Sequence, residues 1–310
     1  MTSRSALLEE RLALAAQILG PRARRNVPIG PRTTYRVGGA AALYFEIGSD
    51  RDLEVVAGAV AGSGVEVLVL GSGSNLLVAD AGFLGLVVVL GPSYSTLSLE
   101  IEPGLVAAGG SCAYPVLARR SAAAGLRGME WAVGIPGSVG GGVRMNAGGH
   151  GAETADRLVE ARVVDLGTGV ERRLDAAALG LAYRSSRLSD RELVLEATFR
   201  CERGDAEASA REIDSIVRWR RENQPGGRNC GSVFANPPGD AAGRLVELAG
   251  LKGTRVGSAV VSTKHANFIQ VDPGGSADDV LRLVDLVRAT VAERCGVTLE
   301  LELRTVGAPR

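Results

Sequence analysis

The stretch GIPGSVGGGVRMNAGGHG, residues 134–151, constrains the fold of this chain more than any other segment. Glycine loses the most conformational freedom on folding, so a run this rich in glycine favours neither a regular helix nor an ordinary strand. Because glycine has no Cβ, it allows backbone to approach a ligand or another segment closely. The sequence therefore predicts backbone wrapped tightly around something at residues 134–151.

A second glycine turn, LGSGSNLLV at residues 70–78, lies between two apolar runs. It has only the first two glycines of the GxGxxG fingerprint, with Leu76 at the third, and it lacks the lysine of a phosphate loop. Its glycine pair still lets backbone N–H groups approach a pyrophosphate, although a purely structural turn is the alternative. Two such turns, each after a strand pattern, predict a dinucleotide between them, and FAD fits better than ATP.

Length and charge narrow the class of protein. A chain of 310 residues exceeds the usual size of one hydrophobic core, so two or three domains are expected. The 35 basic and 35 acidic residues cancel, which argues against nucleic acid or an anionic membrane as a partner. No apolar run approaches the roughly 20 residues of a membrane span. Residues 1–20 carry charges within an apolar pattern, which is typical of an amphipathic helix and not of a signal peptide.

The cysteine and histidine residues offer no metal site. The 4 cysteines are far apart with no CxxC pair, and the 2 histidines show no metal-ligand spacing with them. This usage indicates a reduced, cytoplasmic protein without a bound metal.

Apolar runs rich in β-branched residues alternate with helical patterns, which indicates an α+β or α/β fold. We expect strands near residue 44 and at residues 65–71, 83–91, 158–166, 192–202, 258–271 and 299–306. We expect helices at residues 1–20, 50–61, 112–125, 206–223, 239–250 and 276–295, and a short one between the strands at 158–166 and 192–202. The turn-rich QPGG at residues 224–227 predicts a domain joint.

Several motifs together carry a specific resemblance. In chain order they are TTYRVGGAA (33–41), LGSGSNLLVAD (70–80), GMEWAVGIPGSVGGGVRMNAGGHG (128–151), YRSS (183–186), GSVFANP (231–237), AGLKG (249–253), KHANFI (264–269) and GVTLELELRTVG (296–307). They resemble, in order and over almost the whole chain, the motifs of the UDP-N-acetylenolpyruvoylglucosamine reductase (MurB) family. The ordered set is more specific than any one motif.

The resemblance implies an α+β fold with an FAD-binding fold of the vanillyl-alcohol-oxidase (PCMH) type in two subdomains and a C-terminal α+β substrate-binding domain. The implied boundaries are residues 1–88 for the first FAD-binding subdomain, to which residues 299–310 return, 89–208 for the second, and 209–298 for the substrate-binding domain. The short interval from Arg184 to Ser232 resembles the compact branch of the family, which lacks an extra substrate-covering insertion. The expected non-covalent FAD contacts are Gly71, Ser72, Gly73, Ser74, Asn75, Gly134, Ile135, Pro136, Gly137, Ser138 and Gly140.

The resemblance also implies a reaction. Family members reduce FAD with NADPH and then transfer hydride from the flavin to the enolpyruvyl ether of a UDP-sugar, which yields UDP-N-acetylmuramate for peptidoglycan synthesis. Hydride addition leaves negative charge on the carbon beside the substrate carboxylate, so the site needs a cation and a proton donor. The implied partners are the UDP-sugar and NADPH, and the sequence gives no oligomeric state.

Three residues match the family's catalytic positions. Arg184 matches the arginine that binds the substrate carboxylate, a planar cation suited to a planar anion. Ser232 matches the serine that protonates the intermediate, and Glu302 matches the glutamate that supports it through charge and proton relay. From the residues alone, a surface arginine, a turn serine and a glutamate on the solvated face of a strand are the plainer interpretations.

Other positions are expected to matter less or to leave alternatives open. Tyr183 and Asn236 match substrate-contacting positions, whereas His150 and His265 are interpreted as structural. Ala235 stands where the family usually has lysine, which keeps open a paralogous flavoenzyme with another substrate. A non-catalytic flavin-binding protein is a further alternative, and retention of the three catalytic residues argues against both.

One more position departs from the family pattern. Leu301 stands where proline is common in the terminal motif, which leaves Glu302 in register.

Overall fold

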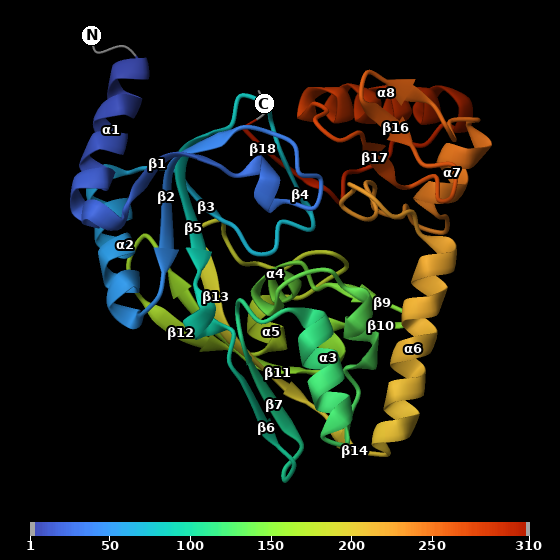
Figure 1. The fold of residues 1–310 in the computed structure, drawn as a ribbon, viewed down its shortest axis with the longest axis horizontal. Helices are drawn as coiled ribbons and strands as arrows, with labels where there is room; N and C mark the ends of the chain where they lie inside the picture. The colour runs from blue at the N-terminus through green and yellow to red at the C-terminus, as the bar shows by residue number, and fades with distance from the viewer. Residues whose placement is uncertain (1–3, 308–310) are drawn as a thin grey trace. The chain divides into compact units, whose positions relative to one another are not determined.

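The computed structural model describes residues 4–307, which divide into two compact units (Figure 1). Unit 1 comprises residues 4–27, 42–72 and 84–218, and unit 2 comprises residues 28–41, 73–83 and 219–307. The chain thus passes repeatedly between the units, and the three-part division implied by the resemblance stays a prediction.

A four-stranded sheet in the order β1-β2-β5-β3 lies mostly in unit 1. Its strands are β1 (Arg24–Pro28), β2 (Ala40–Ile47), β3 (Val67–Val69) and β5 (Phe83–Leu90), and β3 runs parallel to β5. Helices α1 (Arg4–Leu19) and α2 (Asp50–Ser63) share an apolar core with this sheet. Ser49 and Asp52 form the capping box that begins α2, and Gly64, at φ 65°, ends it.

The second sheet of unit 1 is antiparallel, in the order β12-β11-β13-β7-β6. Its strands are β6 (Leu97–Glu100), β7 (Leu105–Gly109), β11 (Leu158–Asp165), β12 (Glu171–Leu174) and β13 (Glu192–Arg200). Helices α3 (Tyr114–Ala123) and α5 (Ala176–Leu179) contribute to its core, as does Leu126 of β8 (Leu126–Arg127), which pairs with β14 (Glu202–Arg203).

The glycine-rich stretch lies against this second core. It begins at the end of the 3-10 helix η4 (Glu130–Gly134) and contains the short helix α4 (Val139–Arg144) and part of the hairpin β9 (Gly148–Gly149) and β10 (Ala152–Glu153). No regular element dominates it, as the sequence predicts. The remaining 3-10 turns are η1 (Gly20–Arg22), η2 (Gly30–Arg32), η3 (Pro92–Tyr94) and η5 (Thr154–Asp156).

Unit 2 is built around a three-stranded sheet in the order β15-β16-β17 and two helices. These elements are β15 (Arg255–Val256), β16 (Ala259–Val261), β17 (Ile269–Val271), α7 (Ala242–Leu248) and α8 (Ala277–Cys295). A parallel pair joins β4 (Leu76–Val78) to β18 (Arg304–Val306), which lies close to the C-terminal end of the chain. The long helix α6 (Ala206–Asn223) contains the boundary between the units.

The predicted helices are confirmed within residues 4–307, and residues 1–3 of the first lie outside the described part of the chain, but the predicted strand at residues 299–306 is wrong in its first half. Only Arg304–Val306 forms β18. Residues 300–303 hydrogen-bond instead with residues 233–235: the Ala235 N–H donates to Glu300 O, and the Glu302 N–H to Val233 O, both at 2.9 Å. The terminal segment changes partner midway, so regular strand geometry begins only where β4 becomes its neighbour.

Asp80 anchors the start of α8, and its replacement is expected to destabilise unit 2. Its carboxylate accepts hydrogen bonds from Ser276 Oγ at 2.5 Å and from the backbone N–H groups of Ala277 and Asp278 at 3.0 and 3.2 Å. Burial acts to raise the pKa of Asp80, but these hydrogen bonds outweigh it and hold the pKa below its ordinary value. Asp80→Ala should lower the free energy of unfolding by about 1–2 kcal/mol at neutral pH, as loss of a helix cap does.

The pH dependence of this loss of stability follows from the lowered pKa of Asp80. A lowered carboxylate pKa stabilises the fold above the unfolded-state value, about 3.9, and that stability is lost as the pH falls through the folded-state pKa. Urea unfolding of wild type and Asp80→Ala should therefore differ at pH 7 and converge toward pH 3. Asp285→Ala, at an exposed position of the same helix, is the control. A difference that persists unchanged at low pH would show that the carboxylate charge is not the cause.

Candidate active site

The two glycine segments predicted to bind a dinucleotide meet within unit 1. A Cβ built on Gly71 would lie only 2.6 Å from Oγ of Ser138. The Gly140 N–H donates to Gly110 O at 2.9 Å, and a Cβ at residue 140 would lie 3.1 Å from that oxygen. Cβ atoms at these positions would come too close to neighbouring protein atoms, so glycine is what allows the two segments to pack this closely. Two glycine turns brought together in one compact unit fit the FAD that the sequence predicts between them.

The other predicted flavin contacts of unit 1 continue the same backbone path. Gly134 ends η4, and a Cβ there would lie 3.0 Å from the His150 ring. Gly137 O accepts the Tyr114 N–H at 2.9 Å, and Ser138 begins α4 by accepting the Gly141 N–H at 3.4 Å. Between and beside them, Ile135 is half-buried, and Ser72 and Pro136 are exposed.

The rest of the first glycine turn belongs to unit 2. Gly73 has φ 62°, and a Cβ there would lie 2.7 Å from Arg32 O, so this position requires glycine. Ser74 and Asn75 are half-buried. Nδ2 of Asn75 donates one hydrogen bond, to Glu302 O at 2.9 Å.

Arg184 lies in unit 1 on a turn held in the left-handed region, at φ 53°. Its Nη2 donates to Gly148 O at 2.9 Å, and its guanidinium lies 4.9 Å from the centre of the Tyr183 ring. Tyr183 is 50% exposed, so this predicted substrate contact is open to solvent. The guanidinium is thus oriented by the glycine-rich stretch and by an aromatic face.

Arg144 and Asn146, which follow the predicted flavin-binding segment, hold the turn that carries Arg184 through hydrogen bonds. The buried Asn146 donates from Nδ2 to Ala182 O at 3.1 Å and accepts the Ala155 N–H at 2.9 Å. Ser186 Oγ donates to Arg144 O at 2.7 Å. Asn146 lies within the motif at residues 128–151, but the sequence predicts no role for it. A buried asparagine cannot be distinguished from a loop asparagine by sequence pattern.

Ser232 and Glu302 come together in unit 2, although 69 positions of sequence lie between them. The isolated bridge Phe234↔Leu301 aligns the two segments antiparallel. The N–H groups of Glu302 and Leu303 both donate to Val233 O, at 2.9 and 3.2 Å. Each of the two candidate residues is half-buried. Arg184 belongs to the other unit.

Asn267, which the sequence reasoning missed, holds the segment that carries Ser232. Its Oδ1 accepts the Phe234 N–H at 3.0 Å, its Nδ2 donates to Phe234 O at 2.8 Å, and its backbone O accepts the Val233 N–H at 2.9 Å. Its side chain thus makes the hydrogen bonds to the Phe234 backbone that a neighbouring strand would otherwise make. The motif KHANFI was its only signal in the sequence.

Asn236 and His265 make structural contacts in unit 2. The side-chain oxygen of Asn236 accepts the Ala242 N–H at 3.0 Å, at the start of α7. His265 Nδ1 accepts the Asn267 N–H at 3.2 Å, and burial, aided by the charge of Lys252, lowers the pKa of the imidazole. The ring is therefore neutral at pH 7, in keeping with the structural interpretation.

Cys230 and Tyr35 are both buried in unit 2. Burial raises the pKa of the Cys230 thiol to about 12; the Tyr35 hydroxyl acts in the opposite sense, and the negative charge of Glu302 reinforces the rise. Burial and the adjacent thiol raise the pKa of Tyr35 as well. Both groups stay protonated at neutral pH, so Cys230 does not offer a thiolate that would compete with Ser232.

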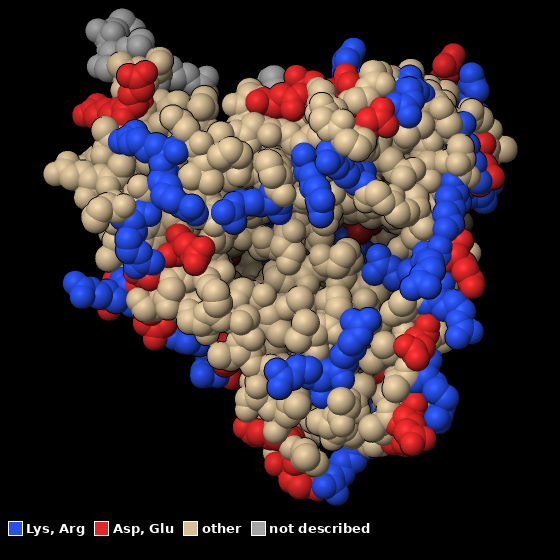
Figure 2. Space-filling view, in the orientation of Figure 1, with Lys and Arg blue, Asp and Glu red and all other residues tan. Residues whose placement is uncertain are grey.

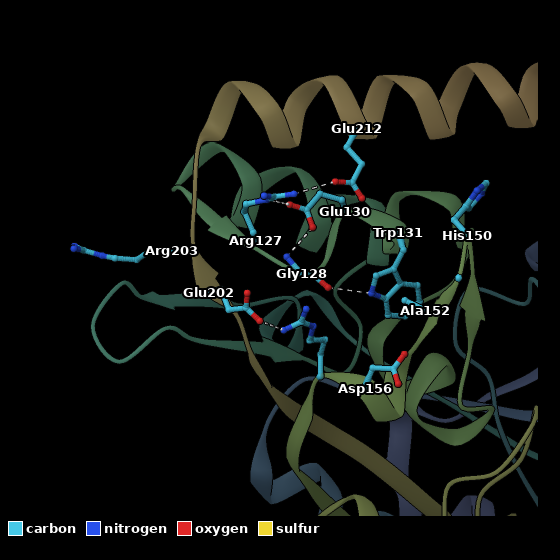
Figure 3. Close-up of a pocket in the computed structure, with 12 residues that line it drawn as sticks. Arg127, Gly128, Glu130, Trp131, His150, Ala152, Asp156, Glu202, Arg203 and Glu212 are labelled. Carbon is cyan, nitrogen blue, oxygen red and sulfur yellow. Dashed lines mark hydrogen bonds and ion pairs between the residues drawn. The ribbon is translucent and has the colours of Figure 1, made fainter.

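A polar pocket of about 520 Å³ opens elsewhere in unit 1 (Figure 3). Glu212 points from α6 toward Arg127, and Arg127 also lies 3.6 Å from Glu130. Burial acts to raise the pKa of Glu130, but hydrogen bonds from Ser209 and Gly128 and the charge of Arg127 keep it below its ordinary value. Glu130 and Glu212 are thus both paired with Arg127 in the wall of this pocket.

Charge and metal-ligand chemistry give no further site. Basic and acidic side chains are interspersed over the face shown in Figure 2. Within residues 4–307, no three histidine, cysteine or acidic side chains gather as metal ligands, and no helix is long and apolar enough to cross a membrane. All four cysteines are free thiols.

The chain is similar to known proteins along nearly its whole length. Residues 223–306 match the UDP-N-acetylenolpyruvoylglucosamine reductase C-terminal domain, and residues 41–175 match an FAD binding domain. A UDP-N-acetylenolpyruvoylglucosamine reductase of Rubrobacter xylanophilus is 44% identical over 295 residues, which cover 94% of this chain and 98% of the relative. One of Chloroflexus aggregans is 41% identical over 297 residues, covering 91% and 97%. The crystal structure of such a reductase from Thermus caldophilus matches with a TM-score of 0.80 at 35% identity, covering 92% and 99%.

Proposed function

The chain belongs to the UDP-N-acetylenolpyruvoylglucosamine reductase family, and we infer from this that it is an FAD-dependent oxidoreductase acting on a CH–CH group. It reduces UDP-N-acetylglucosamine enolpyruvate to UDP-N-acetylmuramate in peptidoglycan precursor synthesis. The observation that carries the assignment is the 44% identity to a named reductase over 94% of the chain. The match of residues 41–175 to an FAD binding domain supports FAD as the cofactor. NADPH is the proposed electron donor, and the cytoplasm is the proposed location.

Arg184 is proposed to bind the substrate carboxylate. When bound, FAD supplies the hydride that adds to the methylene carbon of the enolpyruvyl group. The negative charge then lies on the adjacent carbon and is shared with the carboxylate, as in an enolate. A guanidinium held by Gly148 O and the Tyr183 ring loses little freedom when it binds such a planar anion.

Ser232 is proposed to deliver the proton that completes the reaction. A serine hydroxyl is a weak acid, so proton transfer to carbon depends on a strongly basic acceptor and on a fixed geometry. The Asn267 clamp on Phe234 provides that rigidity two residues away. Glu302, on the paired segment, is proposed to support the intermediate and to relay a proton that replaces the one Ser232 has given up.

The proposed function is tested by following the visible absorbance of the flavin in the purified protein. Anaerobic NADPH should bleach it, and UDP-N-acetylglucosamine enolpyruvate should restore it. Bleaching without recovery would leave a flavoenzyme with a different acceptor, and Ala235 would then be the first position to examine. A protein that cannot be loaded with FAD would contradict the cofactor assignment.

A further inference from the structure

Asn75 follows the glycines of the first turn, yet its strongest contacts are with the terminal segment of the chain. Its Nδ2 donates to Glu302 O at 2.9 Å across 227 positions of sequence. Its own backbone oxygen accepts the Arg304 N–H at 3.1 Å. Asn75 therefore holds the terminal segment on both sides of Leu303, through its side chain and its main chain.

The opposite edge of the same peptide is held by the segment that carries Ser232. The Glu302 N–H donates to Val233 O at 2.9 Å, directly after Ser232. Both backbone polar groups of Glu302 are thus engaged, one by Asn75 and one by Val233. All these residues lie in unit 2, so the arrangement belongs to one compact body.

The Asn75 side chain acts where regular pairing fails. Residues 302 and 303 lie between the bridge at Leu301 and the start of β18, and they belong to no strand. A half-buried carbonyl without a partner is costly, so it would pull the segment toward another donor or toward water. The carboxamide of Asn75 supplies the hydrogen bond that a neighbouring strand would otherwise give.

From these contacts we propose that Asn75 is a positioning residue for Glu302 and, through Val233, for Ser232. The inference rests on the proposed function, which assigns proton delivery to those two groups. Asn75 links the glycine turn to the proton-delivering pair, so its loss should slow reduction of the enolpyruvyl substrate by each enzyme molecule that carries FAD, and not only lower the FAD content.

The test uses the FAD-loaded enzyme with Asn75→Ala and Asn75→Asp, which removes the Nδ2 donor at nearly constant size. Anaerobic stopped-flow mixing measures flavin reduction by NADPH and flavin reoxidation by the enolpyruvyl substrate separately. With both rates expressed per bound flavin, we expect the first to remain within about twofold, while the second falls by up to about 100-fold, the scale of a small misplacement of reacting groups. kcat should fall more than KM rises.

Controls separate this inference from neighbouring explanations. Asn223→Ala also removes one bond from a side-chain amide to a backbone oxygen, that of Trp219, and should leave both rates unchanged. If Asn75 acts through Glu302, its substitution should cost much less in a Glu302→Gln background. A normal reoxidation rate per bound flavin would overturn the proposal, whatever the FAD content of the variant. Failure of the wild type to be reoxidised would instead contradict the proposed function.

Discussion

Ser232→Ala is expected to lower the rate of flavin reoxidation by the enolpyruvyl substrate by about 10²–10⁴-fold, the usual contribution of a positioned general acid. The methyl group cannot donate a proton to the carbon that gains negative charge. Water is a poor replacement because the segment is half-buried and clamped by Asn267. Anaerobic stopped-flow spectroscopy with the reduced enzyme measures this rate.

The same variant contains its own control. Flavin reduction by NADPH needs no proton at the substrate carbon, so its rate should remain near that of the wild type. The variant should also keep its FAD, because Ser232 lies outside the glycine turns. Equal loss of both half-reactions would argue that Ser232 supports the structure and does not deliver the proton.

Gly142→Ala is expected to be the most destabilising small substitution in the flavin-binding region, by about 3 kcal/mol or more. A Cβ at residue 142 would lie 1.7 Å from Cε2 of Tyr114 and 2.6 Å from its hydroxyl. The Tyr114 ring is fully buried, and its centre lies 5.8 Å from the centre of the Trp131 ring and 6.3 Å from that of the Phe199 ring. Its hydroxyl is hydrogen-bonded to the Thr154 hydroxyl, so the ring has no space into which it could move. Thermal unfolding and FAD content should both decline, since α4 continues the proposed flavin-binding backbone.

Gly141→Ala, one position away in the same helix, is expected to have the opposite effect on the stability of the protein. Gly141 is exposed in the same helix, and a Cβ there would lie 3.4 Å from Ser138 Oγ, which is ordinary contact. Replacing a helical glycine by alanine should stabilise the protein by about 0.5–1 kcal/mol. If both variants were equally destabilised, intolerance of the whole helix, and not the clash with Tyr114, would be the cause.

Local patterns were sufficient for the regular elements. The charged helical periodicity of residues 206–223 and the apolar run at 83–90 correspond to α6 and β5 because burial of one face is a property of the segment itself. The strand predicted at residues 299–306 failed in its first half because alternation cannot reveal that the partner changes from Val233–Ala235 to β4.

By itself, the sequence determined the family, through the order of its motifs, and with it the cofactor and the reaction. It also determined where glycine is required, since close approach of backbone leaves a compositional trace at Gly71 and Gly142. Only the tertiary structure decided that Asn75 reaches Glu302 and that Asn267 clamps Phe234. Such bonds join residues distant in sequence and depend on how the chain closes, and a lone asparagine carries no periodic signal of its partner.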